Sequence, residues 1–298
     1  MKELCKTVAF AVIIFFTSGA YSANKEVLKV PKSRSVFDIS HVFHIQLMMN
    51  ALERSGDYPI LPRLEETFEM SMGRAEQELK SGGKLDIYWL GASKANTKGL
   101  RAIHYPTTKG LIGYRKFLIN KASKAKLDKV QSTEMLSQLT ACQGSHWPDT
   151  RILGQASLPV VTSTDYETLF KLLDRGRCDY FPRGYHDVLG ELETRQGLYP
   201  NLMQYDRIML HYPYAVYFYT SVENEALARS MEKGLERMFR SGDMERFMQL
   251  HPLTSDIFPL SDESATLILK IDNHDLPDES EPNNAMFWLQ PSDFNFNN

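Results

Sequence analysis

The sequence predicts an α/β protein of two lobes, the second inserted into the first. Two β-α-β-α-β runs, over residues 27–90 and 139–181, each favour a mainly parallel sheet with helices packed on it. Long extended stretches at 110–119 and 212–220 flank the second run. These stretches would carry the chain to the second lobe and back, which makes them two hinge crossings.

The first run follows from helical spacing of apolar residues and from glycines that end helices. Gly56 and the pair Gly82-Gly83 are the two stops. The predicted elements, in order, are a strand at 27–30, a helix at 41–55, a strand at 58–64, a helix at 68–80 and a strand at 86–90.

The second run and the return of the chain are read in the same way. We expect a short helix at 133–136, strands at 139–142, 158–161 and 178–181, and a helix at 165–175. After the second crossing, an amphipathic pattern predicts a helix at 224–241, ended by Gly242, and a further helix at 244–250. The acidic, proline-bearing tail 253–298 is expected to pack on the first lobe through the apolar runs 267–269 and 287–289.

The N-terminus has the pattern of an export signal. Lys2 and Lys6 precede an unbroken apolar run at 8–16, which is too short to span a bilayer. Small residues follow, so we expect residues 1–22 to be a signal peptide cleaved after Ser22, leaving an exported, soluble protein. A retained membrane anchor is the alternative.

Export matters for the two cysteines that remain, Cys142 and Cys178, because disulfides persist in oxidising compartments. The sequence leaves open whether these cysteines form a disulfide or remain two buried thiols. A catalytic thiol is the weaker alternative. The net charge is −3 and no basic run stands out, which argues against a nucleic-acid partner.

A turn between an apolar strand and a helix start, at 141–153, predicts a ligand cradle. Unpaired backbone N–H groups at a helix start attract anionic groups. Trp147, Asp149 and Thr150 lie at this start, although plain helix capping also explains Asp149 and Thr150. Arg183, after the next strand, is the strongest single candidate for binding a carboxylate, and an ion pair with Asp187 or Glu191 is its alternative.

Further candidates come from the first lobe. Trp89 ends a strand and would either stack on a ligand or pack in the core. Three cations of this lobe are further candidates: Lys98 and Arg101 on a polar stretch, and Arg34 after the first strand. Each would bind a carboxylate or a phosphate of the ligand, or else remain solvated.

Several motifs, in this order, resemble those of periplasmic solute-binding proteins of the type 2 class, in particular extracellular family 3, which includes polar amino-acid binders. They are Leu85-Asp86-Ile87-Tyr88-Trp89 followed by Ser93, then Tyr105-Pro106 ahead of Gly110-Leu111-Ile112-Gly113-Tyr114-Arg115, then Leu172-Leu173-Asp174-Arg175-Gly176-Arg177-Cys178-Asp179, and the final helices 227–250. The resemblance covers residues 25–252. The first-lobe arginine that usually holds an amino-acid carboxylate has no clean counterpart, and the tail is an addition.

The resemblance implies a first lobe of residues 23–114 and 215–298 and a second lobe of residues 115–214. It also implies that a ligand bound between the lobes holds them closed. Ser93 joins the ligand candidates on this basis. We expect a monomeric periplasmic protein that binds a small polar ligand, anionic or zwitterionic and amino-acid-like, for uptake through an ABC permease.

Two other functions remain open, a sensory or partner-binding module that reads the closed state through a receptor, and an enzyme on the same fold. No nucleophile elbow, phosphate-binding loop or dinucleotide-binding turn occurs in the sequence. His41 and His44 are spaced as a metal pair on one helix, but no third ligand is evident. We therefore expect no catalytic activity, no metal and no cofactor.

Overall fold

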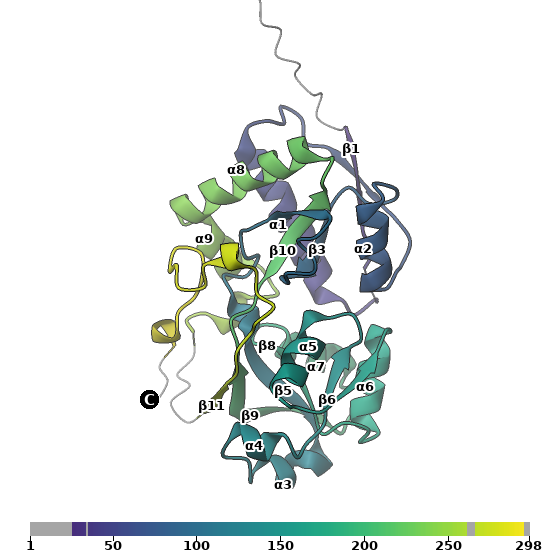
Figure 1. Cartoon of the computed structure of the whole chain (residues 1–298), viewed down its shortest axis with the longest axis vertical. Coiled ribbons are helices and arrows are strands. Elements are labelled where there is room, and N and C mark those ends of the chain that lie inside the picture. The colour runs from purple at the N-terminus through teal and green to yellow at the C-terminus, as the bar shows by residue number, and fades with distance from the viewer. Residues whose placement is uncertain (1–25, 34, 261–265, 295–298) are drawn as a thin grey trace, which may run out of the picture.

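Two small sheets and the helices around them build the first lobe of the computed structural model, which describes residues 26–33, 35–260 and 266–294 (Figure 1). Strands β1 and β2 pair in parallel, and β10 lies between β3 and β4 in an antiparallel sheet. The elements of this lobe are β1 (Val27–Val30), α1 (Ile39–Ser55), β2 (Arg63–Glu66), α2 (Met72–Lys80), β3 (Tyr88–Gly91), β4 (Leu100–Ile103), β10 (Val216–Ser221), α8 (Glu225–Ser241) and α9 (Asp243–Leu250).

A six-stranded mixed sheet in the order β11-β9-β5-β8-β6-β7 builds the second lobe. Its parallel pairs are β6–β7, β6–β8 and β9–β11, whereas β5 runs antiparallel to both neighbours, so the expectation of a mainly parallel sheet holds only in part. The elements are β5 (Tyr114–Asn120), α3 (Lys124–Leu127), α4 (Thr133–Leu136), β6 (Ala141–Gly144), α5 (Pro148–Gln155), β7 (Val160–Ser163), α6 (Tyr166–Asp174), β8 (Tyr180–Gly184), α7 (Val188–Arg195), β9 (Leu202–His211) and β11 (Leu267–Lys270).

The two-lobed α/β architecture is therefore as predicted, with differences in detail. Strand β4, helix α7 and strand β9 were not predicted, and the first part of the stretch 110–119 is a short 3-10 turn before β5. The chain crosses into the second lobe at β5 and returns between the end of β9 and the start of β10.

Local sequence signals explain where the long helices end. Gly56 follows α1 at φ 72° and Gly242 follows α8 at φ 80°, a left-handed conformation that costs glycine little. Asp165 precedes α6, and its carboxylate accepts a hydrogen bond from the Thr168 amide. Helices α1 and α8 pack so closely at Gly234 that a Cβ there would lie 1.8 Å from the carbonyl oxygen of Ala51.

The tail does not pack on the first lobe alone, which corrects the expectation for residues 253–298. Strand β11 pairs in parallel with β9, from Leu267 opposite Ile208 to Lys270 opposite His211, and so forms an edge of the second lobe's sheet. Further on, Trp288 is buried among residues of the first lobe. An apolar run in an acidic tail does not say which sheet edge it will meet, because pairing depends on a distant strand.

The two cysteines form a disulfide, which settles the alternative left open by the sequence. Cys142 lies in β6 and Cys178 just before β8, with their Cα atoms 5.5 Å apart. Both side chains are buried, which fits a structural bridge. Within the described parts of the chain, no helix is long and apolar enough to cross a membrane.

Removing this disulfide should lower the free energy of unfolding by about 2–5 kcal/mol, because the bridge closes a loop of 36 residues in the unfolded chain. The test is urea unfolding of the Cys142→Ala/Cys178→Ala variant, compared with the wild-type protein with and without reductant. Reduced wild type should match the variant. Equal stability of the oxidised wild type and the variant would contradict a stabilising role.

Candidate functional site

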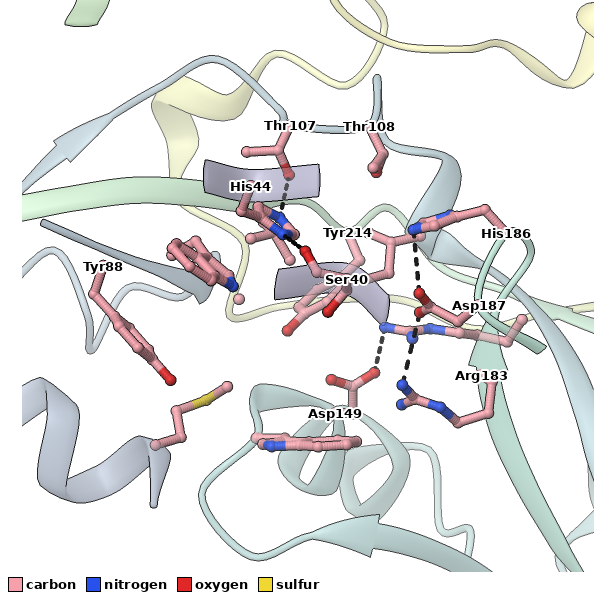
Figure 2. A pocket seen from close by; sticks show the side chains of 17 residues that line it. Ser40, His44, Tyr88, Thr107, Thr108, Asp149, Arg183, His186, Asp187 and Tyr214 are labelled. Carbon is pink, nitrogen blue, oxygen red and sulfur yellow. Dashed lines mark hydrogen bonds and ion pairs between the residues drawn. The ribbon is translucent and has the colours of Figure 1, made fainter. Parts of the chain in front are cut away.

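A pocket lies between the two lobes, and both contribute to its walls (Figure 2). Helix α1, strand β3 and the loop after β4 form the first-lobe wall, and β5, the start of α5 and the end of β8 form the second. The lining residues are Ser40, His44, Met72, Tyr88, Trp89, Gly91, Thr107, Thr108, Ile112, Arg115, Trp147, Asp149, Arg183, His186, Asp187, Tyr214 and Val216.

A buried ion pair between Arg115 and Asp149 forms part of the second-lobe wall of the pocket. Nη2 of Arg115 lies 2.5 Å from Oδ1 of Asp149, and the Tyr212 hydroxyl donates a hydrogen bond to the same oxygen. Burial alone would lower the pKa of Arg115, but the Asp149 carboxylate raises it above its ordinary value. Asp149 also lies in the first turn of α5, where the helix dipole favours a negative charge.

Arg183 is neutralised within its own lobe. Its Nε and Nη2 donate to the two carboxylate oxygens of Glu191 at 2.6 and 2.5 Å, the bidentate geometry of a strong pair. Burial works against the charged form, yet Glu191 holds the pKa of Arg183 well above its ordinary value. The guanidinium carbon lies 5.1 Å from the centre of the Trp147 ring, so Arg183 supports this aromatic wall of the pocket.

The geometry around His44 defines its tautomer. Nδ1 lies 2.8 Å from the Ser40 carbonyl oxygen, which can only accept, so Nδ1 carries the proton. Nε2 then accepts from the Thr107 hydroxyl at 3.2 Å. The ring is parallel to Trp89, with centres 4.9 Å apart, and thereby fixes the orientation of that indole.

These contacts engage both ring nitrogens of His44 within the protein. His41, which the sequence spaces one helical turn from His44, lies near Glu66, with Nε2 3.6 Å from the carboxylate. Over the residues that the structure describes, no group of histidine, cysteine and acidic side chains is arranged to hold a metal ion.

Three buried polar atoms belong to pocket residues and have no hydrogen-bond partner within the described chain. They are Oγ1 of Thr108, Nε of Arg115 and Nδ1 of His186. Burial lowers the pKa of His186 and so favours the neutral ring, although Asp187 partly offsets this. Buried polar groups are rarely left unpaired, so these atoms are candidates for hydrogen bonds to a bound molecule.

The predicted site residues divide into two sets. Trp89, Trp147, Asp149 and Arg183 line the pocket, whereas Ser93, Lys98, Arg101 and Thr150 do not. Arg34 lies outside the described residues.

The structure explains why four of the predicted site residues lie outside the pocket. Arg101 lies in the unpredicted strand β4 and pairs with Glu225 and Glu232 of α8 at 3.0 and 2.8 Å. Lys98 is exposed in the turn before β4.

Ser93 and Thr150 have local structural roles. The Ser93 hydroxyl accepts a hydrogen bond from the Asn96 amide and so stabilises the turn after β3. The Thr150 hydroxyl donates to the Gly144 carbonyl oxygen at 2.8 Å, which joins α5 to the end of β6.

Several pocket residues were not proposed from the sequence, although some carried a signal. Arg115 stands in an apolar strand, where a charge needs a buried partner, and His186 and Asp187 follow Arg183 in one loop. Thr108 and Tyr214 carry no such signal, because an isolated threonine or tyrosine near a crossing is ordinary.

Comparison with solved structures identifies the fold as that of two-lobed periplasmic binding proteins. An ancestral arginine-binding protein bound to arginine matches with a TM-score of 0.57 and 15% identity, over 76% of this chain and 99% of the other. A histidine kinase sensor domain similar to periplasmic binding proteins matches with a TM-score of 0.56 and 15% identity, over 77% of this chain and 96% of the other.

An amino-acid ABC transporter substrate-binding protein from Streptococcus pneumoniae, bound to L-arginine, matches with a TM-score of 0.53 and 15% identity, over 70% and 81%. These identities establish the fold and not the ligand. No protein-family model matches the sequence, and no curated protein is significantly similar to it.

Gly91 has no room for a side chain, because a Cβ there would lie 1.6 Å from the Tyr214 hydroxyl. Gly91→Ala should therefore displace Tyr214 from the pocket and cost about 1–3 kcal/mol of stability, measured by urea unfolding. Gly154→Ala on α5 is the matched control, since nothing lies within 4 Å of its Cβ position. Equal stability of the two variants would show that Tyr214 does not pack as described.

Proposed function

We propose that this protein is a periplasmic solute-binding protein that closes its two lobes around a small polar ligand. The pocket carries the proposal, because it combines aromatic walls from both lobes with buried charged groups. Trp89 belongs to the first lobe and Trp147 to the second. A ligand that touches both would bind the closed form more tightly than the open one.

The polar atoms of the pocket favour a zwitterionic or anionic ligand that is amino-acid-like. Nε of Arg115 is a donor suited to a carboxylate or carbonyl oxygen, and Oγ1 of Thr108 lies in the opposite wall. The Asp149 carboxylate accepts hydrogen bonds from Arg115 and Tyr212 and lines the same pocket. Arg115 and Asp149 would thus supply both signs of charge in one wall.

We further propose export and delivery to an inner-membrane ABC permease. The expected signal peptide, residues 1–22, falls outside the described residues, so this step rests on its sequence pattern. The disulfide between Cys142 and Cys178 fits an oxidising compartment. Of the described residues, 26–114 and 215–260 would form the first lobe and 115–214 the second, with the tail no longer assigned to the first lobe alone.

A sensory module is the second candidate, favoured by the likeness to a histidine kinase sensor domain. Once a ligand is known, deletion of the gene separates the two. Lost uptake of that ligand supports transport, whereas unchanged uptake with a lost transcriptional response supports sensing.

The ligand is identified by thermal-shift screening of the mature, ligand-free protein against amino acids, di-acids, sugars, peptides and phosphorylated metabolites. A compound at a hundred times its Kd adds about 2.7 kcal/mol, which shifts the melting temperature of a chain of this size by about 5–11 °C. No shift with any class, on protein shown to be folded, would contradict the proposal.

Arg115→Lys should weaken binding of the compound found in the screen about tenfold or more, because lysine lacks the planar guanidinium donors. Isothermal titration calorimetry measures the Kd. Arg101→Lys is the matched control, since this arginine pairs with α8 outside the pocket, and its Kd should equal that of wild type. Equal losses in both variants would place the site elsewhere.

A further inference from the structure

The C-terminal tail is attached to both lobes on either side of the pocket. Strand β11 extends the second lobe's sheet by pairing with β9 (Figure 1). About 20 residues later, Trp288 is 3% exposed in the first lobe's core. It lies against Gly110, where a Cβ would approach the indole to 2.2 Å, and its Nε1 donates to the Ser280 carbonyl oxygen. The tail therefore connects the lobes in addition to the two crossings.

Between these anchors, Asp275 contacts both lobes at once. Its carbonyl oxygen accepts a hydrogen bond from the Lys94 amide at 2.7 Å, and its carboxylate accepts from Nε of Arg151 at 2.8 Å. Lys94 lies on the first lobe, just after β3, and its side chain also pairs with Asp278 at 3.1 Å. Arg151 lies on α5 of the second lobe.

The two elements that Asp275 joins are walls of the pocket. Lys94 follows Gly91 by three residues, and Arg151 follows Asp149 by two, and both Gly91 and Asp149 line the pocket. Any motion that opens the pocket by separating β3 from α5 must also separate Lys94 from Arg151. Asp275 cannot then keep both contacts.

We propose that residues 266–294 form an interlobe strap and that Asp275 is a clasp that holds the pocket closed. The clasp favours the closed arrangement in the absence of ligand, and opening requires Asp275 to release one lobe. This inference rests on the proposed lobe closure. Its consequence is a higher apparent affinity, since the binding-competent form is populated before the ligand arrives.

The chain's tryptophans provide a readout that needs no ligand. The sequence contains three: Trp89 and Trp147 in the pocket and Trp288 in the strap. Trp288 is 3% exposed and its indole is bonded within the strap, so acrylamide quenches it little, and quenching of the fluorescence of the unaltered tryptophan set reports chiefly how open the pocket is. Small-angle X-ray scattering of the same ligand-free, mature protein reports overall compactness.

Two variants weaken the clasp from opposite sides, Arg151→Gln on α5 and Asp275→Asn on the strap. Each should lower the closed-to-open ratio about two- to fivefold, the effect expected for a partly exposed ion pair. The radius of gyration and the quenching of the pocket tryptophans should rise in both. Arg229→Gln is the matched control, because its partner Glu225 lies on the same helix, and it should leave both readouts unchanged.

Unchanged compactness and quenching in both clasp variants would overturn the clasp, whatever the ligand screen shows. If the clasp variants open the pocket but no compound in the screen binds, the clasp is supported and the proposed binding function is contradicted. Circular dichroism of each variant confirms that it is folded.

Discussion

The buried ion pair between Arg115 and Asp149 is the interaction on which the site depends. It joins the first crossing strand, β5, to the start of α5, and the Tyr212 hydroxyl at the end of β9 completes it. Leaving either charge unpaired in this environment would cost about 3–5 kcal/mol, so the two elements keep a fixed relation. The second-lobe wall is thus rigid, and lobe motion must occur outside it.

A second pair, between Arg183 and Glu191, fixes the adjacent part of the same wall. It places the guanidinium over the Trp147 ring, so the charge is paired with Glu191 and packed on an aromatic side chain rather than free for a ligand. Across the pocket, His44 performs a comparable task for Trp89. Both walls are therefore pre-organised aromatic surfaces whose polar supports are already satisfied, which reduces the ordering cost of binding.

The strap changes how such a two-lobed protein would respond to ligand. With two crossings alone, a ligand supplies all the free energy that favours closure. Here Asp275 contributes contacts to both lobes, so part of that free energy is built into the chain. The benefit is a pocket closer to its binding-competent form, and the cost is slower release of the ligand.

Much of the fold could be predicted because its signals are local. The glycines at 56 and 242 end helices through their own backbone freedom, and Asp165 caps α6 through a neighbouring amide. Strand β4 was missed because it has only four residues and follows a polar stretch, and only its pairing with β10 shows that Arg101 belongs to a strand.

The sequence by itself determined the two-lobed α/β order, the ends of most long helices and four of the residues that line the pocket, because these depend on spacing along the chain. Only the tertiary structure decided which charges meet. Arg183 had two candidate partners one and two turns ahead, whereas Arg115 found Asp149 34 residues away and β11 found β9 about 60 residues away. Pairing over such separations depends on how the whole chain packs, which no local pattern encodes.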